Sequence, residues 1–112
     1  KIIKKEDGEI IWDKESAFEI ERKSRAFEPW PGVFSFFSPN QNSKKIRRIN
    51  FTKIEVVKGY FVPGKIYPEF VVGTKSGGLK ILNLKLEGKK EIDSYSFLLG
   101  YPNLIGTFFK LY

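Results

Sequence analysis

The sequence predicts a mostly β protein, a small OB-like β-barrel with a leading α-helix and a short second helix. A single amphipathic helix signal stands near the start of the chain, and five or six short β-prone segments follow, separated by turn residues. With 112 residues and no cysteine, the chain can bury one hydrophobic core without disulfides, and it is too short for two domains. An SH3-like barrel fits almost as well, because periodicity alone does not fix the strand order.

We expect one domain over residues 1–112, with a leading segment, helix and corner in residues 1–32 and the barrel in residues 33–112. Ser16 and Glu19 have the spacing of a capping box at the start of the helix. The apolar residues that follow recur at helical spacing on one face: Ala17, Ile20 and Phe27. Pro29 cannot continue the helix, so the sequence Pro-Trp-Pro-Gly that begins there predicts a rigid corner.

The rest of the chain is typical of short strands. The candidates are residues 33–38, 45–57, 65–67, 70–75, 79–86 and 107–111, with a polar turn at 39–43. In the long segment 45–57 the apolar residues change parity near Thr52, which predicts a β-bulge. A short helix is expected to begin at Asp93 or Ser94 and to end at Gly100.

Aromatic residues are abundant, and we expect most of them to fill the core. The phenylalanines at inward strand or helix positions are Phe34, Phe36, Phe51, Phe70 and Phe97. Trp12 and Trp30 are interpreted as packing anchors. The better candidates for exposed, base-stacking aromatics are Phe37, Tyr60 and Phe61.

The chain is basic, with 20 Lys and Arg against 13 Asp and Glu and a net charge of +7. Such a surplus favours a polyanionic partner, with nucleic acid first and an anionic membrane surface second. The most basic window is opposed only by Glu55 and contains Lys44, Lys45, Arg47, Arg48, Lys53 and Lys58. A second cluster contains Lys80, Lys85, Lys89 and Lys90. The first cluster fits either a strip that contacts phosphates or a solvated strand whose charges protect a sheet edge. The second cluster fits either nucleic-acid contact or spread lysines that only keep the protein soluble.

Catalysis by this chain alone is not expected. Histidine and cysteine are both absent, which removes the commonest general base, the commonest metal ligand and the thiol nucleophile. We therefore expect no catalytic, metal or cofactor site. No segment has the roughly 20 apolar residues of a membrane span and no signal peptide opens the chain, so we expect a cytoplasmic protein. The absence of methionine, even at position 1, predicts a fragment or a processed chain.

Several motifs in a fixed order resemble one family. They are Ile10-Ile11-Trp12, Ser16-Ala17, Arg25-Ala26-Phe27, Pro29-Trp30-Pro31-Gly32, Pro63-Gly64-Lys65-Ile66, Leu79-Lys80-Ile81-Leu82, Glu87-Gly88-Lys89-Lys90 and Phe97-Leu98-Leu99-Gly100. Together they cover nearly the whole chain and resemble the C-terminal domain of the methionyl-tRNA formyltransferase family. Ser24 departs from the pattern, since the family usually has an aliphatic residue there.

The resemblance implies the second domain of a two-domain enzyme. In the family, the N-terminal catalytic domain binds 10-formyltetrahydrofolate and carries an asparagine–histidine–aspartate set, which a chain without histidine cannot hold. The second domain is an OB-like barrel whose basic surface holds the acceptor arm of initiator tRNA. On this chain we expect a monomer that contacts tRNA phosphates without reading bases. The expected contact residues are Lys44, Lys45, Arg47, Arg48, Lys53, Lys89 and Lys90.

Two other readings stay open. The same accessory domain occurs in small-molecule formyltransferases and in formyltetrahydrofolate hydrolase-type enzymes, where it need only pack against its neighbour. The chain also fits an independent single-strand nucleic-acid-binding OB module, which would need an exposed cluster of Phe37, Tyr60 and Phe61.

Overall fold

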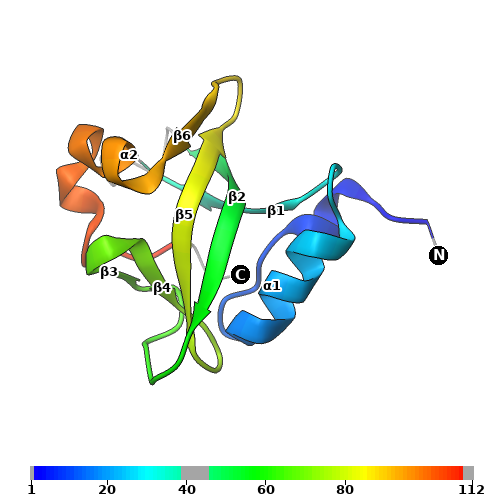
Figure 1. Ribbon diagram of the computed structural model, residues 1–112, viewed down its shortest axis with the longest axis horizontal. Coiled ribbons are helices and arrows are strands. Elements are labelled where there is room, and N and C mark those ends of the chain that lie inside the picture. Colours follow the sequence, from blue (N-terminus) through cyan, green and yellow to red (C-terminus); the bar gives the residue numbers. More distant parts are fainter. Residues whose placement is uncertain (1, 39–45, 110–112) are drawn as a thin grey trace.

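A computed structural model describes residues 2–38 and 46–109 of the chain (Figure 1). The fold is mostly β, with two α-helices, as predicted. Six antiparallel strands form one sheet in the order β1-β2-β5-β4-β3, and β6 pairs with β5 beside this path. The strands are β1 (Val33–Phe37), β2 (Arg47–Val57), β3 (Ile66–Tyr67), β4 (Val71–Gly73), β5 (Gly78–Leu86) and β6 (Glu91–Asp93).

The sheet is open, so the word barrel describes it only loosely. β1 and β3 stand at the two ends of the strand order, and no ladder between them is present in the described part of the chain. The long central pair of β2 and β5 changes register on both sides of Lys53. This confirms the predicted β-bulge, which bends a strand and increases its twist.

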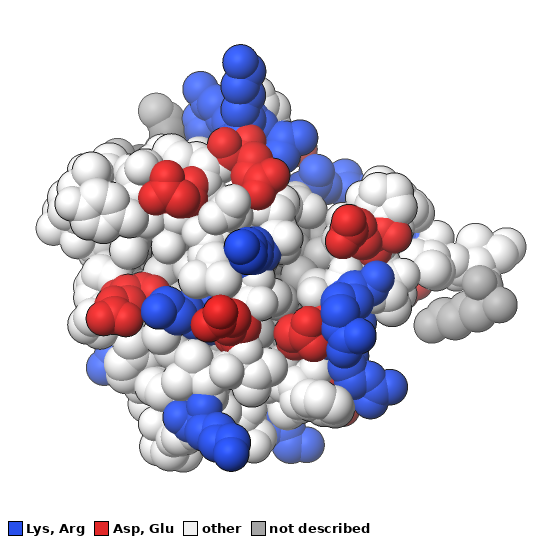
Figure 2. Space-filling view, in the orientation of Figure 1, with Lys and Arg blue, Asp and Glu red and all other residues white. Residues whose placement is uncertain are grey.

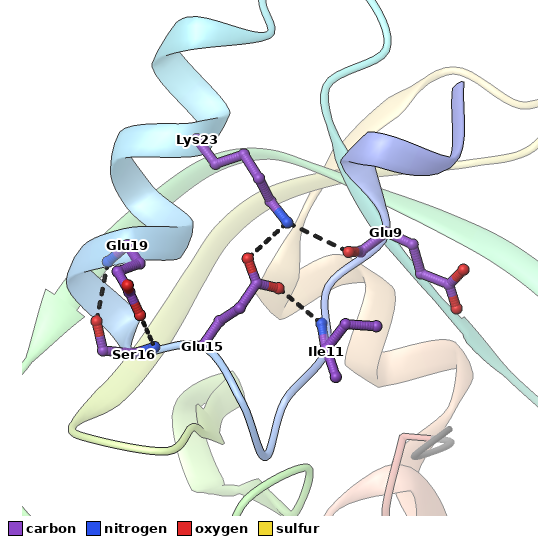
Figure 3. A network of polar contacts seen from close by, with 6 residues as sticks. All are labelled: Glu9, Ile11, Glu15, Ser16, Glu19 and Lys23. Carbon is purple, nitrogen blue, oxygen red and sulfur yellow. Dashed lines mark hydrogen bonds and ion pairs between the residues drawn. The ribbon is translucent and has the colours of Figure 1, made fainter. Parts of the chain in front are cut away.

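Helix α1 (Ala17–Ala26) begins at the predicted capping box. The Ser16 hydroxyl accepts a hydrogen bond from the Glu19 N–H at 3.1 Å, and the Glu19 carboxylate accepts one from the Ser16 N–H at 2.8 Å (Figure 3). Lys23 ties the helix to the preceding segment through Glu15, 2.7 Å away, and through the Glu9 carbonyl at 3.2 Å. The N-terminal segment is therefore fixed against the helix before the sheet begins.

The core is built around Trp12, which is fully buried as predicted. Its ring stacks on Phe109 at a centroid distance of 5.4 Å and meets Phe51 edge-on at 6.0 Å. The indole N–H donates to the hydroxyl of Ser35 at 3.0 Å, so its one polar group is satisfied inside the core. Phe70 stacks on Phe109 and continues this aromatic layer.

Strand β1 corrects two of the aromatic predictions, those for Phe36 and Phe37, and confirms that Phe34 is buried. Phe37 is buried, not exposed, because it packs edge-on against the aromatic rings of helix α2 (Ser94–Gly100) and the turn after it. Phe34 and Phe36 lie on the opposite face of the strand, where their rings meet at 5.7 Å outside the core cluster. Phe36 is only half-buried there.

Trp30 is 58% exposed, so the prediction that it anchors packing is wrong. It stands in the proline corner that follows α1, which ends at Ala26 before Pro29 as expected. A residue held between two prolines has few backbone options for turning inward.

The short segments after β2 differ from their predictions in length. Of the predicted strand 70–75 only Val71–Gly73 pairs, because Glu69 and Phe70 have positive φ angles that interrupt the extended backbone. Of the predicted last strand 107–111 the structure describes residues 107–109, which make one isolated bridge between Phe108 and Lys65. Strand β6 was not predicted, because its three residues are all exposed and show no alternation.

Candidate nucleic-acid interface

Two basic segments that are far apart in the sequence meet at one end of the sheet. Arg47 and Arg48 open β2, and the Arg48 carbonyl accepts a hydrogen bond from the Glu87 N–H at 3.0 Å. Lys89 follows in the tight turn after β5, where its N–H donates to the Leu86 carbonyl at 2.9 Å. We call the cations of this end the basic end cluster; its members are Arg47, Arg48, Lys85, Lys89 and Lys90.

The cluster forms a charged surface over the β5–β6 turn. Figure 2 shows Lys and Arg atoms gathered at the top of the molecule, where Figure 1 places this turn. On the face of the sheet below, acidic and basic side chains are interleaved. Lys85, Lys89 and Lys90 are exposed and have no ion pair within the described residues. The carboxylates of Glu87 and Glu91 lie in the same β5–β6 hairpin as the three lysines of the cluster.

Arg48 is the cation of the cluster whose position is set by packing. Its guanidinium carbon lies 5.3 Å from the centroid of the Phe34 ring, and both side chains lie on the outer face of the sheet. Arg47 has the parity of Ile49 and Phe51, which face the core, and it is half-buried at the end of the strand. The two arginines therefore leave the strand on opposite faces.

Glu91 is held in place by two neutral side chains. Its carboxylate accepts hydrogen bonds from the Asn83 amide at 2.9 Å and from the Thr52 hydroxyl at 3.0 Å. These bonds, the one from Asn83 first, lower the pKa of Glu91 because they favour its charged form. The carboxylate thus stays ionised at the edge of the basic end cluster.

Lys53 does not join the basic end cluster. It lies at the β-bulge, five residues or about 16 Å along β2 from Arg48. There it lines a groove of about 470 Å³ between the end of α1, the proline corner and β2. Three carboxylates also line this groove, those of Glu21, Glu28 and Glu91, so the charge around Lys53 is mixed.

The other predicted cations are divided between three places. Lys44 and Lys45 lie outside the described residues. Lys58 follows the far end of β2, beyond the pair of Val57 and Gly78. Lys80 stands opposite Glu55 and forms an ion pair with Glu69 at 3.6 Å, so its charge is compensated.

Sequence reasoning identified Lys85 as basic but left it out of the expected contacts. The antiparallel register pairs Lys85 with Asn50, two residues after Arg48, and so places Lys85 in the basic end cluster. The sequence alone does not fix this register. Within the described residues, no three acidic side chains converge as a metal site would require. Neither described helix is long and apolar enough to cross a membrane.

The sequence of the chain matches one family of known proteins over most of its length. The model of the family "Formyl transferase, C-terminal domain" matches residues 2–102. A methionyl-tRNA formyltransferase of Dehalococcoides mccartyi strain CBDB1 is 40% identical over 107 residues, which cover 95% of this chain and 33% of that protein. Two further relatives with the same name are from Thermodesulfovibrio yellowstonii and Treponema denticola.

The Thermodesulfovibrio yellowstonii protein is 38% identical over 88% of this chain, and the Treponema denticola protein is 35% identical over 93%. The matched part is 30% of the first protein and 34% of the second, so the chain spans about a third of the length of these relatives. The family match and the relatives agree with the motifs found in the sequence. The chain belongs to the formyl transferase C-terminal domain family.

Proposed function

We propose that this domain is the tRNA-binding accessory part of a methionyl-tRNA formyltransferase. The parent enzyme would transfer a formyl group from 10-formyltetrahydrofolate to initiator methionyl-tRNA, and its catalytic residues would lie in the part of the relatives that this chain does not cover. The names of the relatives support this assignment. The role of the present domain would be to position the RNA.

The meeting of the two basic segments at the basic end cluster is the observation that carries the proposal. Nucleic-acid affinity rises with each phosphate that a lysine or arginine neutralises, because condensed counterions are released. Arg48 offers a planar fork that can donate two parallel hydrogen bonds to one phosphate. The lysines of the β5–β6 turn add mobile point charges beside it. Such contacts fix the orientation of an RNA without reading its sequence.

The proposal assigns no chemistry to this chain. The Glu91 carboxylate near the cluster serves as a hydrogen-bond acceptor for Asn83 and Thr52. The selection of the initiator tRNA would belong mainly to the rest of the enzyme. A packing domain of a small-molecule formyltransferase is the competing outcome, since such a domain would have no need to bind RNA.

Charge reversal tests the proposal. The variant Arg47→Glu/Arg48→Glu should weaken tRNA binding by at least about tenfold at low salt, because it removes two phosphate contacts and adds two repulsive charges. Lys14→Glu/Arg22→Glu changes the net charge by the same amount at exposed positions outside the cluster. The proposal expects the control to bind much more tightly than the cluster variant. Equal losses in the two variants would mean that only net charge matters and would contradict a defined contact surface.

A further inference from the structure

The end of the sheet opposite the basic end cluster carries an exposed tyrosine and two exposed lysines. The β2–β3 connection and the β4–β5 turn lie side by side there, since Val57 pairs with Gly78 and Pro63 bridges Gly73 (Figure 1). Tyr60 stands in the β2–β3 connection and is 87% exposed. That is the largest exposed fraction of any large hydrophobic residue that the structure describes.

The connection that carries Tyr60 is anchored. The next side chain, Phe61, packs against Gly78 so closely that a Cβ on that glycine would lie 2.8 Å from its ring. Phe61 also meets the ring of Tyr67 edge-on at 5.2 Å. The Tyr67 hydroxyl accepts a hydrogen bond from the Val62 N–H at 2.8 Å. Tyr60 is therefore displayed by a fixed backbone, which reduces the entropy that a partner must remove on binding.

The two connections at this end of the sheet each carry an exposed lysine. Lys58 and Lys75 are exposed and have no ion pair within residues 2–38 and 46–109. Glu19 is the acidic residue whose charge interacts with Lys75. Its pKa is lowered first by the hydrogen bonds from Ser16 and in smaller part by this lysine. This end of the sheet thus carries an exposed aromatic ring and two exposed lysines, of which Lys75 also interacts with the charge of Glu19.

We propose that Tyr60, Lys58 and Lys75 form a second RNA contact, in which the tyrosine ring stacks on an unpaired base. Aromatic side chains stack on any base, and neighbouring lysines neutralise the adjoining phosphates. This inference rests on the proposed function. It adds that the domain recognises a single-stranded nucleotide of the RNA. The eleven residues of β2 separate this contact from the basic end cluster by roughly 33 Å.

The chemistry around a second exposed tyrosine argues for RNA rather than protein at Tyr60. Tyr95 is 73% exposed and stands on helix α2 with Leu99, which is 66% exposed. The segment 94–109 around them contains no Asp, Glu, Lys or Arg. Interface cores between proteins are depleted in charge, as the segment around Tyr95 is, whereas Lys58 and Lys75 lie in the two connections at the end of the sheet that carries Tyr60. Tyr95 therefore provides a matched control for an exposed ring without cations.

Two RNA probes separate the second contact from the first. One is a blunt duplex of acceptor-stem length, and the other is the same duplex with four unpaired nucleotides at its 3′ end. The affinity for the blunt duplex reports the basic end cluster. The ratio of the affinity for the overhang RNA to the affinity for the blunt duplex reports the contribution of Tyr60. Failure of the proposed function would appear as no binding of the blunt duplex, whereas failure of the present inference would appear only in the ratio.

The wild-type chain should bind the overhang RNA about five- to tenfold more tightly than the blunt duplex. Tyr60→Ala should reduce this ratio to about one, whereas Tyr60→Phe should keep it because the ring remains. Tyr95→Ala should leave the ratio unchanged. The inference is overturned if wild type shows no preference for the overhang, if Tyr60→Ala keeps the preference, or if Tyr95→Ala loses it as well.

Discussion

The guanidinium of Arg48 lies over the ring of Phe34, with the Cζ atom 5.3 Å from the ring centroid. Phe34 is itself buried and fixed by the edge-on ring of Phe36. The Nε atom of Arg48 is buried and has no hydrogen-bond partner among the described residues. Packing on an aromatic ring thus orients the arginine, whereas the three lysines of the cluster are exposed.

Removing the charge of Arg48 should change the salt dependence of RNA binding. Arg48→Gln is expected to lower the slope of log affinity against log salt by about one, because one phosphate contact is lost. Phe34→Leu leaves every charge in place, so it should weaken binding severalfold through loss of orientation and keep the slope. Fluorescence anisotropy at several salt concentrations measures both quantities.

The chain offers a control for this pair. Arg22 lies over the exposed ring of Phe18 on helix α1, with its Cζ atom 5.5 Å from the ring centroid. Arg22→Gln and Phe18→Leu should leave affinity and slope close to the wild-type values. A slope that falls equally for Arg48→Gln and Arg22→Gln would argue against a phosphate contact specific to Arg48.

The turn lysines should contribute through charge alone. Lys89→Gln/Lys90→Gln is expected to lower the salt slope by up to about two and to weaken binding at low salt. Both side chains are exposed and form no ion pair with the residues that the structure describes, so the melting temperature should stay within a few degrees of wild type. Lys80→Gln is the comparison, since Lys80 is paired with Glu69. A larger effect on RNA binding at Lys80 than at the turn would place the contact elsewhere.

Much of the fold follows from local sequence signals. Ser16 and Glu19 set the start of α1, and the parity change near Thr52 marks the β-bulge, because hydrogen-bonding side chains and alternation act over a few residues. The closure of the sheet was not predictable, since it depends on whether distant edge strands pair. The exposure of Trp30 was missed because hydrophobicity predicts burial only where the backbone lets the side chain turn inward.

The candidate site could be predicted only in part, because the sequence shows which segments are basic but not which of them meet. Arg47 and Arg48 stand out in the sequence as a basic pair, and the turn at Lys89 as another. That these segments meet follows from the antiparallel register of β2 and β5, which short-range patterns do not fix. The register also places Lys58 and Lys80 away from the basic end cluster. The basic residues therefore do not form one continuous strip on the sheet.

The capping box should make helix α1 sensitive to substitution and to acid. Ser16→Ala removes the acceptor for the Glu19 N–H and should lower the free energy of unfolding by about 1 kcal/mol. The pKa of Glu19 is lowered by the hydrogen bonds from Ser16. The stabilisation from Glu19 is therefore present above its ordinary pKa and is lost as the pH falls through the lowered value.

Urea denaturation at neutral and acidic pH measures this effect. Glu19→Gln should reduce the loss of stability between neutral and acidic pH relative to wild type, because the side chain no longer titrates. Ser16→Ala should reduce that pH dependence only in part, since it removes the side-chain hydrogen bond but keeps the larger contribution, the hydrogen bond from the backbone N–H of residue 16 to the Glu19 carboxylate. An unchanged pH profile in both variants would show that the capping box does not couple to folding.

Gly73 should not tolerate a side chain. A Cβ at this position would collide with the backbone carbonyl of Val62, which anchors the connection carrying Tyr60. Gly73→Ala is expected to lower the free energy of unfolding by about 3 kcal/mol or more, at the upper end of overpacking costs. Gly100→Ala is the control, since no atom lies within 4 Å of its added Cβ and the residue ends helix α2.

Gly100→Ala should change the free energy of unfolding by less than about 1 kcal/mol, in the stabilising direction, because alanine favours helix more than glycine does. Thermal unfolding followed by tryptophan fluorescence compares the two variants. Equal stability of Gly73→Ala and Gly100→Ala would mean that the close approach of Val62 and Gly73 is not rigid.

Binding of the chain to labelled initiator tRNA over a range of salt concentrations tests the central claim most directly, with an elongator tRNA as competitor. A domain that positions tRNA through phosphates should bind at low salt, lose affinity steeply as salt rises, and treat the two tRNAs alike. Absence of binding at low salt would contradict the account and indicate a domain that only packs against its neighbour.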